Sequence, residues 1–93
     1  MRFKWDNKKE SILKLNPKRR FGFDKVIKIF EYKYFLDIKN DCPEQFRAIG
    51  FVDGKLITLI YEVREDKLGE YYHLVTYWPA TKTEKALYEE GKN

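Results

Sequence analysis

The chain has 93 residues, enough for one domain with a single modest core and too few for two. Hydrophobic residues make up 43% and charged residues 37%, which excludes a disordered chain and favours a globular one. Residues 1–33 contain eleven Lys and Arg against four Asp and Glu, whereas residues 34–93 contain eight against eleven. The basic first third suits a partner such as RNA, DNA or an acidic protein, and a lysine-rich solvated surface explains it equally well.

The sequence carries no sign of a membrane or secreted protein. No apolar run approaches the length of a membrane span, and no signal peptide is visible. The one cysteine, Cys42, cannot form an internal disulfide, and we expect it to be incidental. These features predict a cytoplasmic protein without a membrane partner.

Two short helices are expected in the first third of the chain. Asp6 is suited to cap the first helix, and Asn16 and Pro17 end it. Asp24 is the candidate cap of the second helix. The apolar residues expected to face the core are Ile12, Leu13 and Leu15 in the first helix and Phe23, Val26, Ile27 and Phe30 in the second.

Strand-forming residues dominate from Tyr32 onward. Asp53 and Gly54 between two apolar runs predict a two-residue hairpin turn of type I′. The apolar centre of the strand that follows predicts that it lies in the middle of the sheet. The expected strands cover residues 32–38, 45–52, 55–64 and 70–78.

A final helix is expected after Pro79, which stops the last strand. Thr81 and Glu84 have the spacing of a capping box at its start, and the helix continues through Tyr88. The predicted order is therefore ααββββα. We expect one α+β domain over residues 1–93, in which a four-stranded antiparallel sheet packs with two N-terminal helices and one C-terminal helix.

Several familiar classes of active site are absent from the sequence. It has no Gly-rich phosphate loop followed by Lys and no GxSxG elbow, and one His and one Cys give no basis for a metal site. The remaining Arg, Lys, Tyr, Glu and His side chains suit RNA cleavage without metal, because RNA supplies its own 2′-hydroxyl nucleophile. Such a site needs a base, an acid and cations, and it needs no cofactor.

Arg64 is the first candidate for a catalytic residue. It closes the third predicted strand, where its planar guanidinium can clamp a phosphate. The alternative is a purely structural ion pair with Glu62, Glu65 or Asp66.

His73 and Arg47 are the other two candidates. His73 in the fourth strand can act as an acid or a base, and the alternative is a surface or fully hydrogen-bonded histidine. Arg47 in the second strand can contact phosphate. Tyr61 is expected to be a core ring rather than a proton donor. The residues assigned to the same side of the strand as His73 are Tyr71, Val75 and Tyr77.

Candidates for RNA binding lie in two other places. Lys18, Arg19 and Arg20 form the densest basic run, which is expected either to contact phosphate or to be a solvated loop. Tyr77 and Trp78 end the fourth strand with two rings that can stack on a base. The alternative for Trp78 is to cover the end of the last helix.

Several segments together carry a resemblance to a known family. They are Phe3-Lys4-Trp5-Asp6 followed by Lys8 or Lys9; Phe23-Asp24 through Phe30; Glu44 through Gly50, Gly54 and Tyr61-Glu62-Val63-Arg64; and Pro79-Ala80-Thr81 with Glu84 and Tyr88. In this order and spacing they resemble the BrnT toxins of bacterial type II toxin–antitoxin modules, over nearly the whole chain.

The resemblance implies a compact fold similar to RelE ribonucleases. It implies a ribonuclease that inhibits translation and is neutralised by a BrnA-like antitoxin of ribbon-helix-helix type from the same operon. Operator DNA would be bound only through the toxin–antitoxin complex. By the same resemblance, Arg64 corresponds to the family's arginine at the end of the third strand.

The chain also differs from the family pattern. It lacks the Lys-His-Gly sequence that usually precedes the second helix, and His73 and Trp78 stand where the family often has Arg. These differences leave a second hypothesis open. The chain would then be a weakened or inactive toxin relative that binds its antitoxin or nucleic acid without cleaving RNA.

Overall fold

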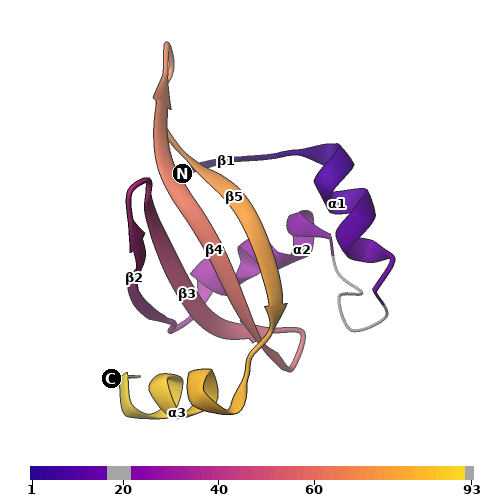
Figure 1. Cartoon of the computed structure of the whole chain (residues 1–93), viewed down its shortest axis with the longest axis vertical. Coiled ribbons are helices and arrows are strands. Elements are labelled where there is room, and N and C mark those ends of the chain that lie inside the picture. Colours follow the sequence, from indigo (N-terminus) through magenta and orange to yellow (C-terminus); the bar gives the residue numbers. More distant parts are fainter. Residues whose placement is uncertain (17–21, 92–93) are drawn as a thin grey trace.

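The part of the chain that the structure describes, residues 1–16 and 22–91 of a computed structural model, folds around a five-stranded sheet with strand order β1-β5-β4-β3-β2. Figure 1 shows the long β4–β5 hairpin at the middle of the sheet, with α1 and α2 on one side and α3 across its lower end. This arrangement confirms the α+β class. The strands are β1 (Arg2–Trp5), β2 (Phe35–Asp41), β3 (Glu44–Val52), β4 (Lys55–Asp66) and β5 (Gly69–Pro79), and the helices are α1 (Asn7–Lys14), α2 (Phe23–Val26), the 3-10 helix η1 (Ile27–Glu31) and α3 (Lys82–Gly91).

β1 was not among the strands predicted from the sequence. It lies parallel to β5, with Arg2 beside Tyr71 and Trp5 beside Leu74. The expected four antiparallel strands are present as β2 to β5, and the addition of β1 makes the sheet mixed instead of purely antiparallel.

The predicted hairpin between the second and third of those strands is confirmed. Asp53 and Gly54 join β3 to β4 with φ angles of 48° and 79°. A type I′ turn needs a positive φ at both central residues, which Gly adopts freely and Asp tolerates. β4 lies at the centre of the strand order, as its apolar sequence predicts.

β5 contains a bulge at Val75. One step along β4 corresponds to two steps along β5 at this point, so Val75 is the extra residue. The bulge reverses the alternation of side chains, and both Leu74 and Tyr77 therefore lie in the main core, each 1% exposed. The prediction that Tyr77 shares a side with His73 is wrong for this reason.

The main core lies between one face of the sheet and the helices α1, α2 and η1. Phe23, Val26 and Ile29 are completely buried there against strand residues such as Leu59. η1 comes so close to β3 that a Cβ atom at Gly50 would lie 2.7 Å from Cγ1 of Ile29. Glycine at this position is therefore a packing requirement.

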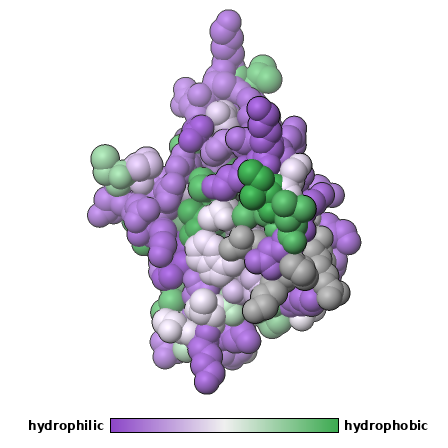
Figure 2. All heavy atoms as spheres, turned by 45° about the vertical axis from the view of Figure 1, so that its right-hand side comes forward, coloured by the Kyte–Doolittle hydropathy of each residue, from purple (hydrophilic) through white to green (hydrophobic). Residues whose placement is uncertain are grey.

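α1 begins at its predicted cap, but its apolar stripe is narrower than expected. The Asp6 carboxylate accepts hydrogen bonds from the amides of Lys8 at 2.8 Å and Lys9 at 3.2 Å. Of the expected stripe, Leu13 is buried, whereas Ile12 and Leu15 are 68% and 82% exposed. Figure 2 turns the side of the molecule that carries α1 forward and shows an apolar area within a mostly hydrophilic surface.

The second predicted helix is a single α-turn that continues as the 3-10 helix η1. Its cap position is Gly22 and not Asp24. The carboxylate of Glu10 in α1 accepts a hydrogen bond from the Phe23 amide at 2.6 Å, so a side chain from the first helix satisfies the start of the second.

α3 packs on the opposite face of the sheet. Its predicted capping box is present: the Glu84 amide donates to Thr81 Oγ1 at 3.2 Å, and the Thr81 amide donates to Glu84 Oε1 at 2.9 Å. Ile49, Ala80 and Tyr88 form a small second core under this helix. Over the described residues, no helix combines the length and apolarity needed to cross a membrane.

Candidate functional site

The three predicted catalytic residues lie on one face of the sheet. His73 pairs with Glu62, and Arg47 pairs with Ile60, two residues before Glu62 on β4. Paired residues of antiparallel strands point to the same face, as do residues two apart on one strand, so Arg64 joins them. We define the polar face as the set Asp37, Gln45, Arg47, Glu62, Arg64 and His73, on the side opposite the main core.

Arg64 is paired with a carboxylate of its own strand. Its Nε and Nη2 atoms donate to Oε1 of Glu62 at 3.0 and 2.7 Å. Of the three partners considered from the sequence, Glu62 is thus the one it contacts. The Arg64 side chain is still 48% exposed, so its outer N–H groups can meet a ligand from solvent.

Glu62 connects two strands of the polar face, and it was not among the site residues predicted from the sequence. Its second oxygen, Oε2, accepts a hydrogen bond from Gln45 Nε2 at 2.7 Å, and the residue is 9% exposed. The bond from Gln45 lowers the pKa of the Glu62 carboxyl, burial opposes this, and Arg64 lowers the pKa further. The signal was the i,i+2 spacing of Glu62 and Arg64, which places both side chains on one side of a strand.

His73 lies beside this pair and is partly buried. Burial lowers the pKa of its imidazole first, and the charge of Arg64 lowers the pKa further, whereas the Glu62 carboxylate acts in the opposite direction. The net direction is downward, which favours the neutral form of the ring. In its neutral form, His73 can accept a proton.

Arg47 is more deeply engaged than Arg64. It binds both oxygens of Asp37 on β2, with Nε to Oδ1 at 2.9 Å, and its Nη1 lies 3.7 Å from Glu84 Oε2 in α3. The hydrogen bond to Asp37 raises the pKa of the Arg47 guanidinium. Through these contacts Arg47 connects β3 to β2 and α3. Only 18% of its side chain is exposed.

The aromatic candidates divide into core and helix contacts. Tyr77 packs edge-on against Phe23 at 5.0 Å between ring centroids, and at 1% exposure its ring has no face available to a base, so its predicted role in stacking is wrong. The indole Nε1 of Trp78 donates to Glu84 at 2.9 Å, which agrees with the alternative that it covers the end of the last helix. Tyr61 is a core ring, 3% exposed, and burial raises the pKa of its phenol.

The basic run Lys18, Arg19 and Arg20 lies outside the described residues.

β1 adds two further cations beside the polar face. Arg2 binds Asp66 at 2.7 Å and Lys4 binds the same carboxylate at 2.8 Å. Both cations lie over the ring of Tyr71, at 5.4 and 4.4 Å from its centroid. Lys4 is also the strand neighbour of His73, so the unpredicted strand borders the candidate site.

The ion pairs on the polar face and at its border with β1 contain as many carboxylates as cations. Among the described residues, the four cations Arg2, Lys4, Arg47 and Arg64 lie against the four carboxylates Asp37, Glu62, Asp66 and Glu84. A phosphate that binds here therefore competes with carboxylates that are already in place.

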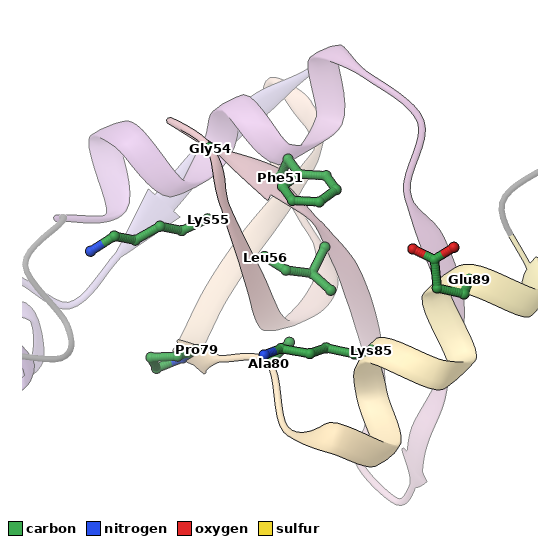
Figure 3. Close-up of a pocket in the computed structure, with 8 residues that line it drawn as sticks. All are labelled: Phe51, Gly54, Lys55, Leu56, Pro79, Ala80, Lys85 and Glu89. Carbon is green, nitrogen blue, oxygen red and sulfur yellow. The ribbon is translucent and has the colours of Figure 1, made fainter.

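A hollow of the surface lies elsewhere, between the β3–β4 hairpin and α3 (Figure 3). It has a volume of about 460 Å³, and its walls include Phe51, Leu56, Pro79, Ala80, Lys85 and Glu89. None of the predicted site residues that the structure describes lines it. Within the described ranges, no group of three or more His, Cys, Asp or Glu residues is arranged to hold a metal ion.

Comparison with models of known protein families gives no match, and comparison with curated proteins gives none.

Proposed function

We propose that the chain is a ribonuclease toxin of a type II toxin–antitoxin module, which cleaves RNA without metal and so inhibits translation. One observation carries the proposal: a half-exposed arginine, Arg64, and the single histidine, His73, extend from neighbouring strands on the same face. The family resemblance of the sequence supports the same function.

The chemistry needs little from the protein. Neutral His73 takes the proton of a ribose 2′-hydroxyl, and the 2′-oxygen forms a bond to the adjacent phosphorus. The bond from phosphorus to the 5′-oxygen of the next nucleotide breaks, and water gives that oxygen a proton. The products are a 2′,3′-cyclic phosphate and a 5′-hydroxyl. Arg64 stabilises the charge on the phosphorane with its outer N–H groups.

The test is incubation of the purified protein with RNA in EDTA. We expect cleavage by the wild type, and a loss of at least about a hundredfold in His73→Asn and Arg64→Ala. Lys67→Ala, at the exposed turn between β4 and β5, is the matched control and should cleave normally. Intact RNA, together with normal growth of cells that express the wild type without an antitoxin, contradicts the proposal.

A second candidate function rests on the charge balance of the same region. Since all four cations there lie against carboxylates, a weakened or inactive toxin relative that only binds its antitoxin or nucleic acid is the alternative. The partner would be a small ribbon-helix-helix protein from the same operon, whose acidic segments would face the basic first third of the chain. Operator DNA would be bound only through that complex.

The two functions differ in one pair of measurements. A pull-down that captures a small protein from the neighbouring gene, without cleavage of RNA by the free chain, supports the binding module. Cleavage that is lost in Arg64→Ala while the antitoxin still binds supports the ribonuclease. An equal loss of both activities in a folded Arg64→Ala variant would argue that Arg64 is structural.

A further inference from the structure

We infer that Glu62 is a positioning residue, whose carboxylate fixes the Arg64 guanidinium beside His73 and balances its charge. The contact between Glu62 and Arg64 is a property of the fold. The use of Arg64 and His73 in catalysis rests on the proposed function.

Glu62 is held from both of its oxygens. Oε1 accepts the two bonds from Arg64, and Oε2 accepts the bond from Gln45. Gln45 is itself oriented, because its Oε1 accepts a hydrogen bond from Asn40 Nδ2 at 3.1 Å, which leaves its Nε2 to face Glu62. A continuous line of hydrogen bonds therefore runs from β2 through β3 to β4 and ends on Arg64.

These hydrogen bonds reduce the conformational entropy that Arg64 would lose on binding a ligand. A half-exposed arginine loses rotamer freedom when it is fixed by a ligand alone, and this loss weakens binding. Glu62 already restricts the side chain through Nε and Nη2, and no bond to Nη1 is found among the described residues. The guanidinium is thus held in place with an edge left for an anion.

Glu62 also affects the electrostatic environment of the His73 imidazole. Its carboxylate and the Arg64 cation are close together and act on the imidazole in opposite directions. Removal of one member of the pair leaves the other uncompensated. The other charged or titratable groups around His73 are Lys4 on β1, Lys9 and Asp6 at the start of α1, and Tyr71 on its own strand.

The single histidine makes the inference measurable without RNA. An NMR titration of the full chain reports the pKa of His73 alone, because no other imidazole is present. We expect Glu62→Gln to lower this pKa and Arg64→Gln to raise it. Glu65→Gln is the matched control, since this exposed glutamate is on the same strand but alternates to the other face, and it should leave the pKa unchanged.

Opposite shifts in the two variants support the positioning role. A His73 pKa that is the same in Glu62→Gln as in the wild type, or a shift as large in Glu65→Gln, overturns it. If Glu62→Gln does not fold, as judged by circular dichroism, the exposed Arg64→Gln variant still decides, and an unchanged or lowered pKa in that variant contradicts the inference.

A cleavage assay separates this inference from the proposed function. In an active chain, Glu62→Gln should lower the rate roughly ten- to a hundredfold and shift the pH profile toward acid, as its His73 titration shifts. Opposite NMR shifts without any cleavage by the wild type leave the positioning of Arg64 intact and contradict the ribonuclease. Cleavage without the NMR shifts contradicts the role of Glu62 only.

Discussion

The two faces of the sheet are made from the same strands but are stabilised in different ways. On the core face, rings from strands and helices pack together, as Phe30 and Tyr61 do at 5.3 Å between centroids. On the polar face, arginines are held by carboxylates, as Arg47 is by Asp37. Alternation along a strand lets β4 serve both faces: Tyr61 points into the core and Glu62 into the polar face. Packing on one face thus fixes the positions of charged groups on the other.

The bulge at Val75 sharpens this comparison, because it turns Tyr77 to the core face, whereas Tyr71 before the bulge lies on the polar face. Tyr77→Ala should destabilise the fold by about 3–5 kcal/mol, since a fully buried ring leaves a cavity. Tyr71→Ala, on the polar face and partly exposed, is the matched control and should cost much less. Denaturant unfolding measures both, and equal losses would contradict the assignment of the two faces.

The capping box of α3 is expected to have a smaller effect. Thr81→Ala removes the oxygen that accepts the Glu84 amide and should cost about 1 kcal/mol, a fall in Tm of roughly 4–8 °C for a domain of this size. Thr83→Ala in the same helix is exposed and serves as the control. If the two variants melt at the same temperature, the cap does not stabilise the helix.

The ion pairs of β1 should affect mainly the way in which the stability of the fold depends on pH. Hydrogen bonds from Arg2 and Lys4 hold the pKa of the Asp66 carboxyl well below its ordinary value of 3.8. A lowered carboxyl pKa adds stability that is present above the unfolded pKa and is lost as the pH falls below it. Thermal melts should therefore show a weaker loss in acid for Asp66→Asn than for the wild type. The exposed Asp41→Asn should keep the wild-type slope, and an identical slope in all three proteins contradicts the role of Asp66.

Much of the fold could be predicted because its signals are local. The turn at Asp53 and Gly54, the cap at Asp6 and the capping box at Thr81 each depend on a few adjacent residues, and all three are present. β1 could not be found in the same way. Its four residues gain their partner about seventy positions later in the chain, and a parallel pairing leaves no turn in the sequence to mark it.

The sequence could offer candidate residues for a site but not their contacts. Arg64, His73 and Arg47 were identified from their chemistry, and the register places them on one face. The bulge that turns Tyr77 into the core, and the bond from Gln45 that makes Glu62 central, both depend on pairing between strands. A one-residue change in register reverses the face of every side chain beyond it, so these contacts need the structure.

The most direct test of the central claim is a comparison of RNA with the same strand carrying 2′-O-methyl groups, both in EDTA. We predict that the wild type cleaves the RNA to fragments with 2′,3′-cyclic phosphate ends, and that it leaves the 2′-O-methyl strand intact because this strand has no 2′-hydroxyl nucleophile. His73→Asn should cleave the RNA at least about a hundredfold more slowly and leave the 2′-O-methyl strand intact. Cleavage of the 2′-O-methyl strand, or intact RNA with the folded wild type, would contradict the account.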